Sequence, residues 1–183
     1  MPRSIRVFLL LVLPALLCSC GGPRVPRPVP VVGTLDVQFV DSAWDGLEVP
    51  FSGRCGDCGG GGRSPALRIS GLPAQANEII VEFNDLRIRE LATNGGHGTL
   101  AMFTGGRPEI TLPSVREETM KLPRGVRSAG KHRCVLFGHK DGAYKAPCGC
   151  GQGNEYVARV MAVHREGKDK QILAEKTIAM GLF

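Results

Sequence analysis

The sequence has no hydrophobic run long enough to cross a bilayer, and it has few aromatic side chains. Its N-terminal apolar stretch, Val7–Leu17, falls well short of the roughly 20 residues that a transmembrane helix needs, and it contains Pro14. Aromatic residues make up 5% of the chain, and no stretch interleaves them with the basic residues behind the net charge of +6. The sequence therefore indicates no nucleic-acid partner.

Motifs that mark several large enzyme classes are also missing. There is no Gly-x-Ser-x-Gly elbow, no His-Glu-x-x-His pair and no phosphate-binding loop, and the glycines at 151 and 153 do not continue into a dinucleotide fingerprint. We therefore expect a protein that is not an enzyme and that holds neither a cofactor nor a resident metal.

The first 19 residues have the layout of a secretory signal peptide. Arg3 and Arg6 precede the apolar run, and small or soft residues follow it. The segment Leu17-Cys18-Ser19-Cys20 resembles a bacterial lipobox, which has an apolar residue three places before the modified cysteine and a small residue directly before it. The resemblance implies cleavage before Cys20, acylation of that residue by palmitate or similar chains, and a stable membrane anchor. Ordinary secretory cleavage is the alternative.

These features predict an exported protein, lipid-anchored to the bacterial cell envelope at the outer membrane and facing the periplasm. Residues 20–33 consist of the lipidated Cys20 and a Pro-rich linker, in which proline alternates with valine and arginine and favours an extended chain. Residues 34–183 are enough for one hydrophobic core, and no interior stretch has the composition of a second linker. We expect a single domain over that range.

The pattern of apolar residues predicts a mainly β domain. Alternating or continuous apolar segments, typical of strands, occur at 35–39, 47–49, 79–83, 100–103, 134–137 and 156–163. Only 114–121 and 168–176 have helical character. The first has the capping-box spacing of Ser114 and Glu117, and the second is equally compatible with a terminal strand. The expected architecture is an antiparallel β-sandwich with one or two short helices.

Two parts of this domain resemble the phosphatidylethanolamine-binding protein (PEBP) family in its bacterial form. Residues 51–56, Phe-Ser-Gly-Arg-Cys-Gly, lead into Ser-Pro-Ala-Leu at 64–67, and Tyr-Lys-Ala-Pro at 144–147 precede Tyr156 and a long apolar strand. The resemblance spans most of residues 45–183. It implies the β-rich PEBP fold, in which the loops around 64–65 and 146–147 lie side by side and frame one recess.

The resemblance also implies a ligand site. Family members hold an anion, such as a phosphate headgroup, between an Asp-Pro-Asp strand end, a histidine and a Gly-x-His-Arg turn. By this correspondence, a small anionic or phospholipid-headgroup ligand would contact Asp85, His97, Tyr144, Pro147 and Asn154. This chain departs from the family's pattern at Asn154 and Glu155, where a carboxylate replaces the arginine. Like charges repel, so we expect the fold to persist with an altered pocket and an unknown ligand.

Five cysteines lie within the domain, and an exported location favours disulfides over free thiols. Cys134 lies in an apolar segment and is expected to be a buried free thiol. The family correspondence implies that Cys55 and Cys58 pair with Cys148 and Cys150, with the individual connectivity left open. The alternative function is an envelope protein that uses these CxxC and CxC cysteines for metal binding or thiol redox chemistry.

Overall fold

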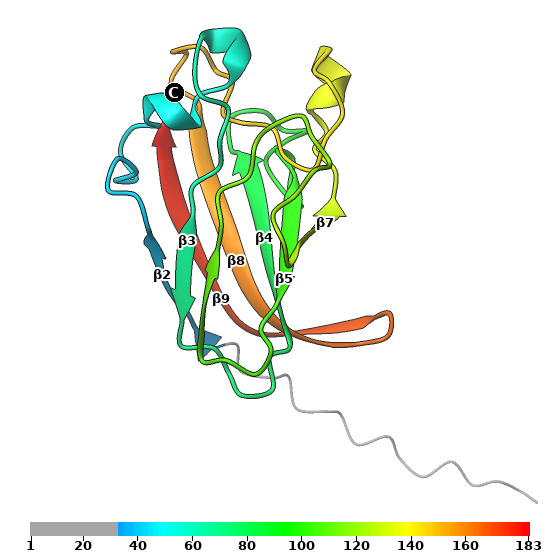
Figure 1. Ribbon diagram of the computed structural model, residues 1–183. Helices are drawn as coiled ribbons and strands as arrows, with labels where there is room; N and C mark the ends of the chain where they lie inside the picture. Colours follow the sequence, from blue (N-terminus) through cyan, green and yellow to red (C-terminus); the bar gives the residue numbers. More distant parts are fainter. Residues whose placement is uncertain (1–32) are drawn as a thin grey trace, which may run out of the picture.

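The computed structural model describes residues 33–183 and shows two β-sheets packed face to face (Figure 1). The larger sheet has the strand order β1-β9-β8-β4-β5-β7, and the smaller one has the order β2-β3-β6. Neighbouring strands are antiparallel, except for β1 and β9, which are parallel. The prediction of a mainly β, antiparallel, sandwich-like domain is confirmed.

The strands have the following bounds: β1 Gly33–Thr34, β2 Asp36–Phe39, β3 Leu67–Ser70, β4 Glu78–Asp85, β5 Thr99–Phe103, β6 Glu109–Leu112, β7 Val126–Gly130, β8 Glu155–Glu166 and β9 Asp169–Leu182. Three short 3-10 helices occur in the described part of the chain: η1 Phe51–Gly53, η2 Gly56–Cys58 and η3 Cys134–Phe137. The strands predicted at 35–39, 79–83, 100–103 and 156–163 correspond to β2, β4, β5 and β8. The sequence of the segment at 168–176 is compatible with a helix or a strand, and in the structure the segment belongs to β9.

Three local predictions are wrong. The strand predicted at 134–137 is the helix η3, which Gly138 ends in a left-handed conformation. The helix predicted at 114–121 does not form, because the Ser114 hydroxyl donates to the Ser64 carbonyl, 2.7 Å away, instead of capping a helix. The strand predicted at 47–49 is reduced to one isolated bridge between Glu48 and Leu182. At 114–121 the contact with the distant Ser64 overrides the local pattern.

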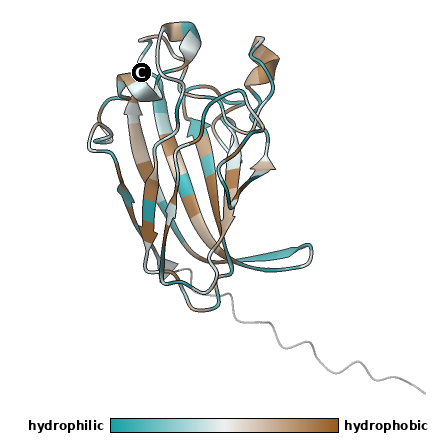
Figure 2. Cartoon of the chain, in the orientation of Figure 1, coloured by the Kyte–Doolittle hydropathy of each residue, from teal (hydrophilic) through white to brown (hydrophobic). Residues whose placement is uncertain are grey.

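The core fills the space between the two sheets. Inward-facing residues of the smaller sheet, such as Leu67 and Ile69 of β3, belong to the same buried cluster as Val81 and Phe83 of β4 and Val160 of β8. Hydrophobic colour therefore concentrates on the strands, whereas the hairpin that joins β8 to β9 is hydrophilic (Figure 2). The two-residue alternation of β3 and the nearly continuous burial of β4 match a half-covered strand and a central strand.

The outer face of the larger sheet carries a smaller apolar cluster and buried charge. Ile80, Met161 and Val163 are buried there. The fully buried Glu78 carboxylate pairs with the guanidinium groups of Arg127 and Arg165, which are partly exposed. Long arginine side chains thus cover an apolar surface while they neutralise a buried charge.

No helix within residues 33–183 is long and apolar enough to span a membrane. The predicted signal peptide, the predicted lipidation site Cys20 and most of the predicted Pro-rich linker lie outside the described residues.

Candidate functional site

A cavity of about 200 Å³ lies where β4 ends and β8 begins, at the end of the sheet that also carries η3. Its walls are formed by Asp85, Ile88, Leu91, His97, Cys134, Phe137, His139, Cys148, Asn154 and Tyr156. Three of the five ligand-binding residues predicted from the sequence, Asp85, His97 and Asn154, therefore line one cavity.

The pairing of β4 with β8 positions two of the polar side chains. Asp85, the last residue of β4, lies opposite Tyr156 in the strand register, and Asn154 directly precedes β8. The Asn154 amide nitrogen donates to the Asp85 Oδ2, 2.7 Å away, and the backbone N–H of Arg87 donates to Oδ1 at 2.9 Å. Asp85 and Asn154 are 1% and 4% exposed, so their contact is shielded from solvent. The amide oxygen of Asn154 is left without a protein partner.

His97 is held by hydrogen bonds on three sides. Its backbone N–H donates to the Phe83 carbonyl at 2.8 Å, and its own carbonyl accepts from the backbone N–H of Lys145 at 2.9 Å. Its ring Nδ1 lies 2.9 Å from the Lys145 carbonyl oxygen. A carbonyl accepts only, so Nδ1 carries the hydrogen. Burial lowers the pKa of His97 to about 4, which makes the ring neutral at pH 7 and leaves Nε2 as an unprotonated acceptor without a protein partner.

Gly98 allows the backbone beside His97 to lie close to the loop at residues 143–145. Its φ is +114°, and an added Cβ would lie 2.2 Å from the Ala143 carbonyl oxygen. Only glycine fits such a position without displacing the backbone. Gly98 thereby holds the His97 ring against the Lys145 carbonyl.

The remaining walls are apolar or chemically inert. Ile88, Leu91 and Phe137 contribute hydrocarbon, and the Tyr156 ring meets the His97 ring edge-on at a centroid distance of 5.3 Å. Cys134 is a buried free thiol, as predicted, and burial raises its pKa to about 12. A thiol with such a pKa is protonated at neutral pH and is a poor nucleophile. The arrangement suits binding of a small molecule.

No family model matches this sequence, and no curated protein matches it. Among solved structures, E. coli YbcL, described as a new member of the mammalian PEBP family, matches with a TM-score of 0.55. The two sequences are 20% identical, and the match covers 82% of this chain and 100% of the YbcL chain. This chain has a PEBP-like fold. At this identity the likeness concerns the fold alone.

Two of the predicted ligand-binding residues do not line the cavity of the PEBP-like domain. Tyr144 is completely buried, with its ring packed edge-on against Phe83 at a centroid distance of 4.9 Å. Pro147 is buried, and its carbonyl accepts from the backbone N–H of Cys55 at 2.8 Å. Both residues support the wall from behind, because the packing of their loop turns them towards the core.

The two loops that the resemblance placed around one recess are also arranged differently. The loop at Pro147 continues into Cys148, which lines the cavity, whereas the loop at Ser64 does not reach it. Ser64 instead hydrogen-bonds Val115 through its backbone N–H and through its hydroxyl, both at 3.0 Å. The cavity is bounded by residues 85–97, 134–139 and 148–156.

Two disulfides attach the η2 loop to the start of the β8 segment. Cys55 pairs with Cys148, and Cys58 pairs with Cys150, which confirms the implied pairing of the two motifs and settles the connectivity. The bridges lie side by side, with 3.9 Å between the sulfurs of Cys58 and Cys148. All four sulfurs are bonded in pairs, so none is free as a thiolate ligand for a metal or as a redox nucleophile in this state.

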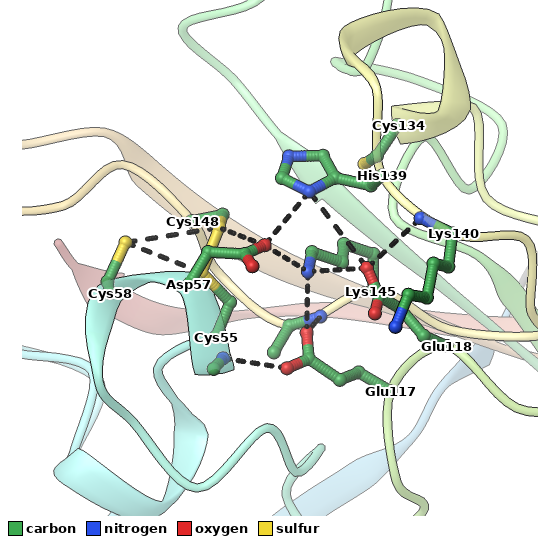
Figure 3. Close-up of polar contacts among 12 residues, drawn as sticks. Cys55, Asp57, Cys58, Glu117, Glu118, Cys134, His139, Lys140, Lys145 and Cys148 are labelled. Atoms are coloured by element: carbon green, nitrogen blue, oxygen red, sulfur yellow. Dashed lines mark hydrogen bonds and ion pairs between the residues drawn. A yellow bond between two sulfur atoms is a disulfide. The ribbon is translucent and has the colours of Figure 1, made fainter.

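Beside the disulfides lies a charged cluster that the sequence analysis missed (Figure 3). The Lys145 ammonium group is 1% exposed and lies 2.9–3.0 Å from carboxylate oxygens of Asp57, Glu117 and Glu118. Burial lowers the pKa of Lys145, but hydrogen bonds to the three carboxylates outweigh this effect and raise it overall. His139 joins the cluster through its Nδ1, 3.0 Å from Asp57. The cluster ties three loops together behind the cavity. No local motif reveals it, because its members are far apart in the sequence.

Proposed function

We propose that this protein is an exported, lipid-anchored protein of the bacterial cell envelope whose PEBP-like domain binds a small molecule in the cavity between Asp85, His97 and Asn154. We propose binding rather than catalysis, since burial raises the pKa of the Cys134 thiol to about 12 and leaves the cavity without a thiolate nucleophile at neutral pH. The lipobox-like sequence at 17–20 supports the anchor. The two disulfides support export, because they persist in oxidising compartments.

The observation that carries the ligand-binding role is a pair of unsatisfied polar atoms in the walls of one cavity. His97 Nε2 and Asn154 Oδ1 are buried and have no hydrogen-bond partner in the protein. Leaving a buried polar group unsatisfied costs about 1–3 kcal/mol, and two such atoms lie in the walls of the same cavity. A ligand that bonds both atoms recovers this free energy.

The ligand-binding role is tested by thermal unfolding of the mature protein with four small probes: n-butylammonium, n-butanol, butanoate and inorganic phosphate. A compound that binds only the native state raises the unfolding midpoint as its concentration rises. We expect at least one probe to do so for the wild type and for Glu155→Gln, which alters an exposed neighbour of the cavity. We expect Asn154→Leu to lose the effect. If no probe raises the midpoint, or if Asn154→Leu responds like the wild type, the cavity is not the binding site.

The proposed anchor is tested by growing bacteria that express the full chain with labelled palmitate. The wild type should incorporate the label and fractionate with membranes, whereas Cys20→Ser should remain unlabelled and leave the membrane fraction. Cys18→Ser is the matched control and should be labelled like the wild type. Labelling that persists in Cys20→Ser would contradict the assignment of the acylated residue.

A further inference from the structure

We propose that the ligand of this cavity presents a hydrogen-bond-donating cation, a primary ammonium group on a short apolar stem, and that the site disfavours anions. This inference rests on the proposed function, since it names the class of ligand for the same cavity. It reverses the polarity that the family resemblance implied, which was a small anionic ligand.

His97 supplies the first acceptor. Its Nδ1 hydrogen is committed to the Lys145 carbonyl oxygen at 2.9 Å, so the opposite nitrogen of the neutral ring has only a lone pair to offer. An ammonium N–H can donate to this lone pair. A carboxylate or a phosphodiester has no hydrogen to donate and would meet it lone pair to lone pair. Inorganic phosphate keeps a hydrogen at pH 7 but brings negative charge towards Asp85.

Asn154 and Asp85 supply further acceptors. The Asn154 amide nitrogen is used by Asp85, 2.7 Å away, which leaves the amide oxygen free. Asp85 accepts hydrogen bonds at both carboxylate oxygens and brings a formal negative charge into the wall. These two side chains and His97 therefore offer lone pairs and negative charge, and among the hydrogens that they could donate only the second amide N–H of Asn154 is left without a protein acceptor.

The other polar groups at the cavity do not reverse this balance. The Cys134 thiol is directed to the Gly96 carbonyl at 3.8 Å, and the Tyr156 hydroxyl accepts from the backbone N–H of Cys148 at 3.1 Å. His139 directs its Nδ1 to the Asp57 carboxylate. None of these contacts points a cationic side chain into the cavity.

The surrounding charges favour a cation as well. Lys145 donates its backbone N–H to the His97 carbonyl. The carboxylates of Asp57, Glu117 and Glu118 enclose its ammonium group. Three carboxylates outnumber one ammonium, so the cluster behind the wall is negative when His139 is neutral. The Arg87 guanidinium donates to the Gln152 carbonyl at 2.6 Å and does not line the cavity. Among the residues that line the cavity, Asp85 is the one acid and none is Lys or Arg, so an anion would be repelled by the Asp85 carboxylate.

The size and the apolar walls limit the rest of the ligand. A volume of about 200 Å³ is filled by roughly seven water molecules at about 30 Å³ each. Ile88, Leu91 and Phe137 offer hydrocarbon contacts for a stem of a few carbon atoms. n-Butylammonium matches these requirements, and n-butanol and butanoate are controls of similar size without the cationic donor.

The test is isothermal titration of the mature, oxidised protein with n-butylammonium, n-butanol, butanoate and inorganic phosphate at pH 7. We expect n-butylammonium to bind at least tenfold more tightly than n-butanol, and butanoate and phosphate to bind more weakly still. Asp85→Asn should weaken n-butylammonium binding tenfold or more, while Glu109→Gln, which removes an exposed charge on β6 of the smaller sheet, should leave it unchanged.

The outcomes separate this inference from the proposed function. Butanoate or phosphate binding as tightly as n-butylammonium would overturn the cationic ligand class and leave the binding role intact. No heat from any probe, with no shift of the unfolding midpoint, would overturn both.

A second measurement needs no variant and covers the case in which Asp85→Asn fails to fold. The nitrogen-15 resonance of His97 Nε2 should have the frequency of an unprotonated nitrogen and move when n-butylammonium is added. Binding of n-butylammonium without any change at this nitrogen would place the amine elsewhere and overturn the inference.

Discussion

At the scale of single residues, the state of the cavity depends on how tightly His97 is enclosed. The ring is 3% exposed and touches the Lys145 carbonyl on one side and the Tyr156 ring on the other. Neither neighbour can move away without disturbing β8 or the loop that precedes it. The unprotonated Nε2 is thus a property of the folded state and not of the isolated side chain.

This enclosure predicts a pH dependence of stability. The pKa of His97 is about 4 in the folded protein and about 6.5 in an unfolded chain, so the unfolded state binds more protons between these values. Stability should therefore fall as the pH drops from about 6.5 towards 4, by up to about 1.4 kcal/mol per unit from this residue. Urea unfolding across that range should show a smaller slope for His97→Gln than for the wild type. Equal slopes for His97→Gln and the wild type would show that folding does not lower the pKa of His97.

Gly98 should be the least replaceable residue near the cavity. Ala at this position combines a φ of +114° with a Cβ that meets the Ala143 carbonyl oxygen. We expect Gly98→Ala to lower the free energy of unfolding by at least about 2 kcal/mol, since backbone strain and overpacking add. Gly106→Ala is the control, because it too has a positive φ but has nothing within 4 Å of the added Cβ. Equal losses in urea unfolding would mean that the close approach to Ala143 contributes nothing.

At the scale of elements, the two disulfides join the same two segments of the chain, 55–58 and 148–150. Each closes a loop of more than 90 residues, Cys55 to Cys148 with a separation of 93 and Cys58 to Cys150 with a separation of 92. Once one bridge has formed, the second closes only a small ring, which consists of residues 55–58, residues 148–150 and the first bridge. The loop-entropy argument then gives about 2 kcal/mol for losing either bridge and about 7 kcal/mol for losing both.

Alanine pairs at 55/148 and at 58/150, and the fourfold variant, measure this non-additivity by urea unfolding. The loss for the fourfold variant should clearly exceed the sum for the two pairs. A simple sum would show that the bridges constrain the unfolded chain independently.

The Lys145 cluster should stabilise the same loops. Lys145→Met leaves Asp57, Glu117 and Glu118 close together without their cation, and breaking a buried ion pair on one side costs about 3–5 kcal/mol. The exposed pair of Lys131 and Asp141 gives the control, since Lys131→Met should cost less than about 1 kcal/mol. Equal losses in the two variants would mean that the cluster does not hold the loops.

The sequence predicts the central strands of the larger sheet well and the short strands and loops poorly, and the reason is physical. Continuous apolarity at 79–83 and 156–163 reflects burial along the whole of β4 and most of β8, whereas the short strands β3, β6 and β7 were not predicted. The segment at 114–121 has a helix-like start, yet Ser114 bonds Ser64, and Glu117 bonds Gly56 and Lys145. Such contacts depend on where the chain returns in space, which no local pattern encodes.

The candidate site shows the same division. Asp85, His97 and Asn154 were found through their correspondence with a family motif, and the four paired cysteines through their spacing and that same correspondence. Tyr144 belongs to the motif but faces the core, because its aromatic ring fills space against Phe83. Cys134, Leu91 and Phe137 line the cavity without any motif, since only the path of the chain brings them there.

At the scale of the whole molecule, the cavity and the start of the described chain lie towards opposite ends. Gly33 pairs with Ala174 near the middle of β9, whereas the cavity residue Tyr156 pairs with Gly181 near its end. The roughly seven residues between these positions on β9 span about 23 Å at the rise of a strand. Figure 1 shows the first described residues, coloured blue, at the end of the domain opposite to the yellow η3. In a protein anchored through its N-terminus, we expect the cavity to lie on the side away from the anchor.

The central claim is that this end of the PEBP-like domain is a binding site, and a map of backbone amide resonances tests it over the whole molecule. On addition of n-butylammonium to the nitrogen-15-labelled protein, the amides of His97, Asn154 and Tyr156 and their neighbours should shift together and saturate with one affinity. The amides of β2 and of the hairpin between β8 and β9 should not move. Saturable shifts confined to those distant strands, or none at the cavity, would contradict the account.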